Sequence, residues 1–357
     1  MGKRLLQKSV EPSVPVDLIR TLAIVLVIMV HAAIEPHPII QVMDQAEVFR
    51  WFTVNTYDSF ANSSVPLFVM LSGALLLQPS KVEPIRTFLK KRAVRLGLPF
   101  IFWGTAYFAW RFFANHEALS ASSIAQGILT GPYYHFWFLY MLFGLYLITP
   151  VLRVVTAYAE RKIIRYFLML WFFGTAVVPL LVLVSGFAVE LKLFAITGWI
   201  GYFLLGYYLL TARVRSSKLY VLFLTGFLWT ILGTYAVTAL VGGHAGLFFL
   251  DYLSASVILA SASLFMLLLK VSPSTLETRF SRANRLLQII GQNTLSIYLL
   301  HVMVLESLQK GYFGFQISVN TMNPIVEVPL ITIVTLFISL GIVFLLKRIP
   351  VMKKLVG

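Results

Sequence analysis

Two ionisable side chains end the segment RTLAIVLVIMVH, which runs from Arg20 to His31. The ten residues between them carry no charge, and nine of those ten are apolar. Eleven residues of helix make about three full turns, so both side chains lie on one helix face, about 16 Å apart along the axis. An arginine can bind an anion, and an imidazole can act as a base or a nucleophile near neutral pH. The pair therefore predicts anion binding at one end of a helix and acid–base or nucleophilic chemistry at the other.

Two acidic residues flank this pair. Asp17 precedes Arg20 by three residues, and Glu35 follows His31 by four. Because side chains at these spacings are neighbours on a helix, we expect Asp17 to pair with Arg20 and Glu35 to hold the His31 ring and raise its basicity. In the alternative interpretation, Arg20 only extends to the membrane interface and His31 only caps a helix end.

A second arginine pair and two further histidines are also candidates. Arg92 and Arg95, in LKKRAVRLGLPF, are three residues apart and can grip a phosphate together. The alternative is that this basic cluster only anchors the following helix at the membrane surface. His135, in YYHFWFLY, and His301, in NTLSIYLLHVMVLES, could assist His31. As alternatives, His135 is an interface residue and His301 a packing residue that donates a hydrogen bond.

Membrane helices must position these residues. Of 357 residues, 59% are hydrophobic and 12% charged, about half the charged fraction of a typical soluble domain. The apolar residues form blocks that reach the roughly 20 residues needed to cross a bilayer. The first block is not followed by a cleavage site and a soluble domain, so we expect it to be retained as a helix. The chain has no cysteine and no histidine cluster at metal spacing, so neither disulfides nor a metal are expected.

The basic residues indicate how the chain is oriented. Ten spans are predicted, near residues 16–36, 58–78, 96–114, 136–157, 163–185, 193–212, 218–241, 247–269, 288–308 and 324–346. With these spans, 24 of the 29 Lys and Arg residues fall on the side that holds both termini and only 4 on the other, Arg20 being inside a span. This asymmetry predicts that both termini are cytoplasmic.

Because the basic residues do not form one block, the net charge of +15 does not indicate nucleic-acid binding. We therefore predict an all-α integral membrane protein with a single domain over residues 1–357, whose longest outer loops are 37–57 and 115–135.

Several segments resemble the membrane acyltransferase-3 family. DLIRTLAIVLVIMVHAA is similar to its first helix, whose signature is an arginine and a histidine separated by ten residues, here Arg20 and His31. The family's Arg-x-x-Arg motif matches Arg92 and Arg95, and SVPLFVMLSG, YHFWFLY, ITPVLR and NTLSIYLLH resemble further family segments. The resemblance covers about residues 16–310 and is closest to the branch that acylates surface polysaccharides. Many members carry a glutamate in the fourth helix, but WFLYMLFGLY has no acid, so no role of that glutamate is carried over.

The resemblance implies a multi-pass protein of the cell membrane that acts as an acyltransferase. The donor would be cytoplasmic acetyl-CoA or another acyl-CoA, and the acceptor a sugar hydroxyl or amine on a surface polysaccharide or lipid-linked glycan. Arg92 and Arg95 would bind CoA phosphates, and Arg20 would bind a further phosphate or help to orient the cofactor. The long pantetheine arm would then bring the thioester to His31, which would act as general base or as a transient acyl carrier. Beyond membrane lipids and the glycan acceptor no partner is implied, and the oligomeric state is left open.

Two other classes of protein remain open from the sequence. A transporter or flippase for an anionic solute or a lipid-linked sugar could line its path with Arg20 and His31. Such proteins commonly show inverted repeats and paired broken helices, and the sequence shows neither. In an assembly or regulatory subunit, the buried charges would only pair with one another.

Overall fold

Helices make up the fold throughout the part of the chain that the computed structural model describes. The described residues are 15–33, 43–80, 83–185, 198–241, 243–318 and 322–357, and no strand occurs among them. The α-helices of the first half are α1 (Val16–Ala32), α2 (Gln45–Ala61), α3 (Ser64–Leu76), α4 (Ile85–Phe113), α5 (Ala121–Thr130), α6 (Trp137–Tyr158), α7 (Arg161–Phe172) and α8 (Val178–Ser185). Those of the second half are α9 (Gly198–Leu209), α10 (Ser216–Val241), α11 (Ala255–Leu269), α12 (Pro273–Arg279), α13 (Ser281–Gln292), α14 (Thr294–Gln309), α15 (Pro324–Lys347) and α16 (Met352–Leu355). Short 3₁₀ turns lie at η2 (Tyr134–Phe136) and η5 (Gly243–Leu250), and a π-helical turn, η3 (Phe173–Val177), joins α7 to α8.

Several of these helices can cross a bilayer. Among the described residues, six stretches are long and apolar enough, or seven if α13 and α14 count as one bent span. The six are Gln45–Leu76, Ala121–Tyr158, Arg161–Ser185, Ser216–Val241, Gly246–Leu269 and Pro324–Lys347. The predicted spans 16–36 and 193–212 correspond to α1 and α9, whose described lengths of 17 and 12 residues are shorter than a full crossing. The chain is therefore an all-helical membrane protein, whereas the number of ten spans and the side of each terminus remain predictions.

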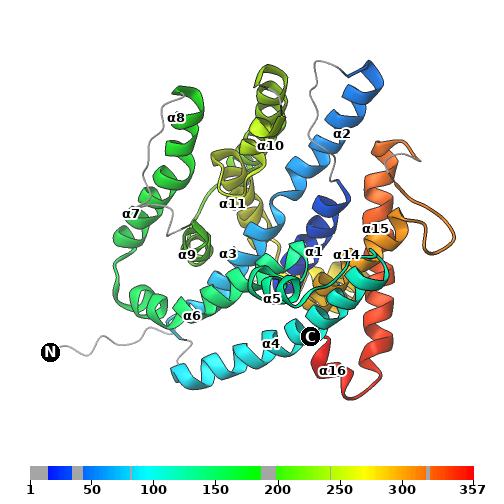
Figure 1. The fold of residues 1–357 in the computed structure, drawn as a ribbon. Coiled ribbons are helices and arrows are strands. Elements are labelled where there is room, and N and C mark those ends of the chain that lie inside the picture. Colours follow the sequence, from blue (N-terminus) through cyan, green and yellow to red (C-terminus); the bar gives the residue numbers. More distant parts are fainter. Residues whose placement is uncertain (1–14, 34–42, 81–82, 186–197, 242, 319–321) are drawn as a thin grey trace.

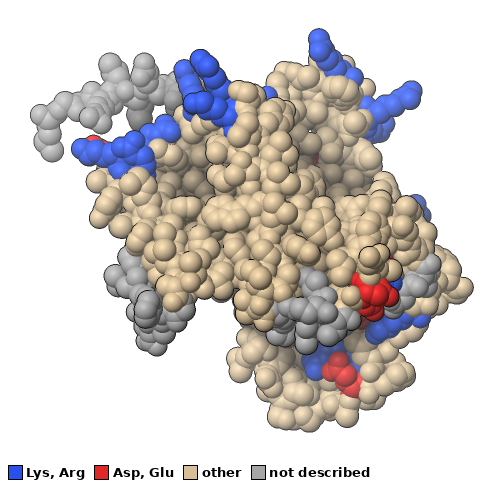
Figure 2. Space-filling view, turned by 90° about the horizontal axis from the view of Figure 1, so that it is seen from above, with Lys and Arg blue, Asp and Glu red and all other residues tan. Residues whose placement is uncertain are grey.

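The surface of several helices is apolar, as contact with lipid requires. Helices α6, α7, α10 and α15 expose large apolar side chains, for example Val154, Tyr166, Leu232 and Phe337. On the face shown in Figure 2, the Lys and Arg side chains lie mostly toward the edges, and the broad area between them is neither basic nor acidic. Exposed apolar area on this scale is unusual in a soluble monomer and fits lipid-facing helices.

Two predicted loops are partly helical. The loop expected over 37–57 contains most of α2, and the loop expected over 115–135 contains α5. Each helix begins at a capping box. The Asp44 carboxylate accepts a hydrogen bond from the Glu47 N–H at 2.8 Å, and the Ser120 hydroxyl accepts one from the Ser123 N–H at 3.1 Å. These caps satisfy backbone donors at the helix start, so the two loop predictions were wrong over these residues.

The predicted span 288–308 is broken in the structure. Helices α13 and α14 meet at an angle of 78° around Asn293. The Asn293 side chain donates to the Ile289 carbonyl oxygen at 2.7 Å and accepts from Lys347 Nζ at 2.9 Å. These bonds supply polar partners at a point where the helical backbone ladder is interrupted. The break places Thr294, the first residue of α14, at the candidate site described below.

Helix α1 lies near the centre of the bundle. It contacts α2, α3, α11, α13, α14 and α15. In Figure 1, α10, α2 and α15 stand roughly upright, α4 lies across the lower part of the view, and α7 and α8 form the left edge. The central position of α1 explains why its polar residues meet side chains from several other helices.

Two glycines let α3 and α9 pack backbone against backbone. A Cβ atom on Gly73 would lie 1.8 Å from the Phe203 carbonyl oxygen, and one on Gly206 would lie 1.9 Å from the Met70 carbonyl oxygen. Such close approach through small residues is typical of helix pairs in membranes.

We expect Gly73→Ala and Gly206→Ala to destabilise the protein because the main chain of the opposite helix must move. Overpacking of a well-packed interior typically costs about 1–3 kcal/mol and occasionally more, and because the added Cβ atom would meet a main-chain oxygen we expect about 3 kcal/mol here. The measurement is the thermal stability and yield of monodisperse protein in detergent. Gly144→Ala is the control, since nothing lies within 4 Å of its added Cβ atom. Equal stability of the Gly73, Gly206 and Gly144 variants would contradict the packing described here.

Candidate active site

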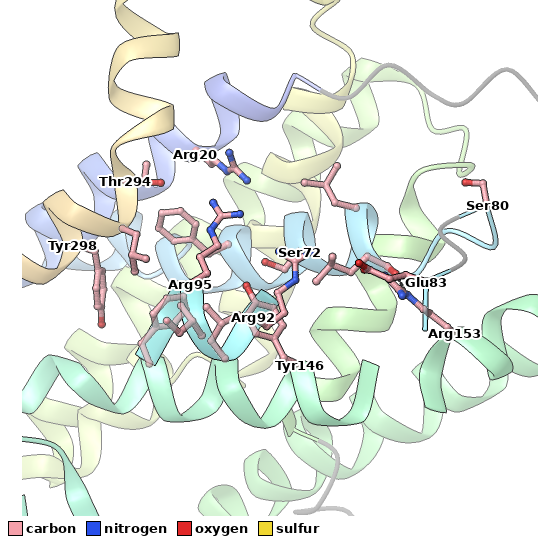
Figure 3. Close-up of a pocket in the computed structure, with 17 residues that line it drawn as sticks. Arg20, Ser72, Ser80, Glu83, Arg92, Arg95, Tyr146, Arg153, Thr294 and Tyr298 are labelled. Atoms are coloured by element: carbon pink, nitrogen blue, oxygen red, sulfur yellow. Dashed lines mark hydrogen bonds between the residues drawn. The ribbon is translucent and has the colours of Figure 1, made fainter. Parts of the chain in front are cut away.

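A cavity of about 670 Å³ opens among α1, α3, α4, α6 and α14. We call it the arginine cavity because four arginines line it. Its polar lining residues are Arg20, Ser72, Ser80, Glu83, Arg92, Arg95, Tyr146, Arg153, Thr294 and Tyr298. In Figure 3, Arg20 from α1 and Arg95 from α4 extend toward each other, while Arg153 and Glu83 lie at the other end. The structure thus brings together all three arginines predicted to bind the donor, from two helices that are far apart in the sequence.

The arginines of this cavity carry more positive charge than the nearby carboxylates neutralise. The positive charges of Arg20 and Arg95 repel each other. Asp17, which precedes Arg20 in the first turns of α1, attracts Arg20 and offsets part of this charge. The Nε atom of Arg92 is buried with no hydrogen-bond partner in the described part of the chain. Its guanidinium group also lies over the rings of Phe88 and Tyr146, at 5.2 and 5.5 Å. Like charges held together in this way favour the binding of an anion, such as a phosphate.

The fourth arginine is held in place by the main chain. Arg153 Nε donates to the Leu76 carbonyl oxygen at 2.7 Å, and the guanidinium group lies 4.6 Å from the Phe88 ring centroid. Glu83 is the acidic residue that lines the cavity, and its carboxylate accepts a hydrogen bond from Lys91. This bond lowers the pKa of Glu83 below its ordinary value, so the carboxylate is charged at neutral pH. Four arginines against one glutamate leave the cavity strongly positive.

Three histidines from separate elements form a cluster beyond one end of the arginine cavity. We call His31, His135 and His301 the histidine cluster. The His301 ring centroid lies 5.2 Å from that of His31 and 5.5 Å from that of His135. His135 and His301 are fully buried. His31, in the last turn of α1, also contacts Tyr134, whose side chain is 50% exposed and so connects the cluster with the surface.

Several ring nitrogens of the cluster have no hydrogen-bond partner among the described residues. His301 Nδ1 lies 2.6 Å from the Tyr298 carbonyl oxygen. Because a carbonyl oxygen only accepts, Nδ1 carries the proton and Nε2 is the basic nitrogen. Among the described residues, His301 Nε2, His31 Nδ1 and both nitrogens of His135 have no hydrogen-bond partner. Imidazole nitrogens in this state can take up a proton or attack a carbonyl carbon.

Tyr298 joins the arginine cavity to the histidine cluster. Its side chain lines the cavity, and its ring centroid lies 5.6 Å from that of His135 and 5.7 Å from that of His301. The Tyr298 hydroxyl donates a hydrogen bond to the His135 carbonyl oxygen. Thr294, Tyr298 and His301 follow one another at spacings of four and three residues, so they form one face of α14. Arg20 meets this face at the cavity end, and His31 meets it at the histidine end.

The remaining expectations have mixed outcomes. Glu35 lies outside the described residues. Asp17 attracts Arg20 electrostatically, as expected, and its side chain packs where a Cβ atom on Gly291 would lie. His135 is not at the surface, since its side chain is fully buried.

Two residues of the site were not predicted. Tyr298 and Arg153 lie in segments quoted for the family resemblance, NTLSIYLLH and ITPVLR, but neither was given a role. The signal for Tyr298 was its spacing of three residues from His301, which places both on one helix face. For Arg153, no spacing within its own helix identifies the cavity that its side chain lines.

The comparisons with known proteins agree with the geometry. A family model described as an acyltransferase domain matches residues 15–344, which include both clusters. The chain matches no curated protein and no solved structure.

Proposed function

The chain belongs to the membrane acyltransferase-3 family, and from this premise we propose that it moves an acyl group from acyl-CoA to a sugar. The acyl group is acetyl in the simplest case. The acceptor is a hydroxyl or amine of a surface polysaccharide or of a lipid-linked glycan precursor. The protein would act in the cell membrane, and the donor would enter from the side on which Lys and Arg concentrate.

The observation that carries this proposal is the Tyr298 junction between the arginine cavity and the histidine cluster. An acyl-CoA has phosphates at one end, a thin flexible arm and a thioester at the other end. The arginines offer charge for the phosphates, and the histidines offer a base about three helical turns away along α1. A volume of 670 Å³ lies within the range of about 300–1,000 Å³ that is typical of ligand cavities.

The proposed reaction needs one base and one thiolate leaving group. A histidine nitrogen, assigned to His31, takes the proton of the acceptor hydroxyl as its oxygen attacks the thioester carbonyl carbon. The C–O bond forms, the C–S bond breaks, and the proton passes through the imidazolium to the CoA thiolate. In the second version, a ring nitrogen of His31 attacks the thioester carbonyl carbon, the C–S bond breaks, and the proton of the other ring nitrogen passes to the CoA thiolate. The acceptor oxygen then attacks the acyl-imidazole, the C–N bond breaks, and the acceptor proton returns to the imidazole. His301 and His135 would support His31 in either version.

The test uses the purified full chain in lipid nanodiscs with radiolabelled acetyl-CoA and a panel of glycan acceptors. We expect label in the glycan and an equal amount of free CoA, together with a mass increment on the glycans of cells that express the gene. Uptake of a labelled anion or lipid-linked sugar into vesicles, without acyl transfer to any acceptor, would instead support a transporter.

A further inference from the structure

The ring of Tyr134 lies between the histidine cluster and the surface. Tyr134 belongs to η2 and directly precedes His135. Its ring centroid lies 5.2 Å from that of His31 and 5.7 Å from that of His135, while the residue is 50% exposed. A molecule that packs on the exposed part of this ring is therefore separated from His31 by no more than one aromatic side chain.

Tyr134 is tied to the end of α14 that lies away from the arginine cavity. Along α14, Thr294 lines the cavity, His301 belongs to the histidine cluster, and Glu306 follows His301 by five residues. These five residues of helix place Glu306 about 7.5 Å beyond His301 along the axis. The Glu306 carboxylate accepts a hydrogen bond from the hydroxyl of Tyr133, the residue before Tyr134. A donor in the arginine cavity and an acceptor at Tyr134 would thus approach the histidines from different directions.

A closed ring of polar contacts fixes the chain at the start of η2. Tyr133 donates to Glu306, whose carboxylate lies 3.5 Å from Lys310 Nζ. Lys310 donates to Asn115 Oδ1 at 2.7 Å, and the Asn115 amide donates back to the Tyr133 hydroxyl at 3.2 Å. These four residues come from α14, the turn after it, the segment after α4 and the start of η2. The turn that carries the exposed tyrosine is therefore held in place before a ligand binds, which lowers the entropic cost of binding.

An aromatic face beside an accessible imidazole suits a sugar ring. The C–H groups on one face of a pyranose are apolar and slightly positive, and they pack on the negative face of an aromatic ring. The hydroxyls at the rim of the sugar then extend beyond the aromatic ring. His31 is only partly buried, whereas His135 and His301 are fully buried. A sugar on Tyr134 can therefore present a hydroxyl to a nitrogen of the His31 ring, which accepts its hydrogen bond.

Membrane lipid is the other possible occupant of an exposed tyrosine face. Tyr166 on α7, which is 60% exposed, illustrates a lipid-facing tyrosine. Tyr134 differs because it contacts the last turn of α1, a helix that itself packs against α2, α3, α11, α13, α14 and α15. The contact with this central helix favours a substrate over bulk lipid as the occupant.

We propose that Tyr134 binds the acceptor. The pyranose ring that receives the acyl group packs on the exposed part of the Tyr134 ring and directs one hydroxyl toward His31. The inference rests on the proposed function and adds to it the residue that recognises the acceptor. It also narrows the substrate class to a cyclic sugar rather than an open-chain alcohol. The bonds formed and broken are those of the proposed reaction.

The test compares cyclic and open-chain acceptors in the wild type, Tyr134→Leu and Tyr134→Phe. Methyl pyranosides of hexoses and N-acetylhexosamines are offered beside glycerol and sorbitol, with labelled acetyl-CoA and the full chain in nanodiscs. For the wild type we expect the higher kcat/KM with the pyranosides. In Tyr134→Leu the ratio of pyranoside to polyol kcat/KM should fall about 10- to 100-fold, because the sugar loses the aromatic face on which it packs. The KM for acetyl-CoA should not change, and Tyr134→Phe should keep the wild-type ratio because it keeps the ring.

Tyr166→Leu is the control, since it removes an exposed tyrosine that lies on α7. We expect the wild-type ratio from this variant. An unchanged ratio in Tyr134→Leu, or an equal loss with both classes of acceptor, would overturn the sugar site, because a purely structural role affects both classes alike. Absence of transfer to every acceptor, the glycan panel included, would overturn the proposed function instead.

Saturation-transfer NMR decides on the sugar site when no small acceptor is acylated. Methyl pyranosides should receive magnetisation from the wild type and lose this signal with Tyr134→Leu. Equal signals from the two proteins, or no signal from either, would overturn the assignment of Tyr134.

Discussion

We expect His31→Ala to lower acyl transfer from acetyl-CoA about 10²- to 10⁴-fold, the range typical of a lost general base. The other two histidines cannot replace it, because His135 and His301 are fully buried whereas His31 contacts the half-exposed Tyr134. The measurement is kcat for labelled acetyl transfer in nanodiscs. The KM for acetyl-CoA should change little, since the arginine cavity is lined by other residues.

His116→Asn is the control for this experiment. His116 is an exposed residue of the segment between α4 and α5 with a φ of 55°, a conformation that asparagine tolerates well. We expect wild-type turnover from this variant. If His31→Ala were equally active, the base would have to be another residue, and the assignment of the histidine cluster would fail.

The second large effect is expected from the arginine cavity. Arg92→Ala combined with Arg95→Ala should raise the KM for acetyl-CoA by at least about 100-fold, because each charge-assisted hydrogen bond contributes about 1.5–3 kcal/mol. Donor analogues that lack one or more of the CoA phosphates separate the contributions. A pantetheine thioester that lacks the nucleotide should react equally slowly with the wild type and the double variant. The wild type should also lose affinity for acetyl-CoA as the salt concentration rises.

Arg86→Ala provides the matched control, since Arg86 is exposed and lies on the same helix outside the cavity. Its KM for acetyl-CoA should equal that of the wild type. An equal loss in Arg86→Ala and in the double variant would mean that α4 needs positive charge only as a membrane anchor. Unchanged kinetics in the double variant would remove the arginine cavity from the mechanism.

Part of the site is visible in the sequence because it lies within single helices. The spacing of Arg20 and His31 predicts a common face, and that of Arg92 and Arg95 predicts a joint anion site. The partners of these pairs come from other helices. Tyr298 and His301 approach α1 only because α14 packs on it, and Arg153 reaches the cavity from α6. Spacing along one helix contains no information on that packing.

The two wrong loops and the broken helix have different causes. The capping boxes at Asp44 and Ser120 can be recognised in the sequence, but the polar residues of the following turns hide both helices from a search for apolar blocks. The break at Asn293 depends on tertiary contacts. Asn293 bonds to Lys347 of α15, and Gly291 packs against Asp17 of α1. Neither contact could be predicted before the arrangement of α1, α13 and α15 was known.

The position of Tyr298 has a consequence for the ion gradient across the membrane. An enzyme that accepts its donor from one side of the membrane and its acceptor from the other must not let protons or ions leak between them. The Tyr298 ring packs 5.1 Å from Phe138, and its hydroxyl is tied to the His135 main chain. If the proposed donor and acceptor enter from opposite faces of the membrane, these contacts of Tyr298 would obstruct the route of ions between the arginine cavity and the histidine cluster, and the electrochemical gradient would be protected during acyl transfer.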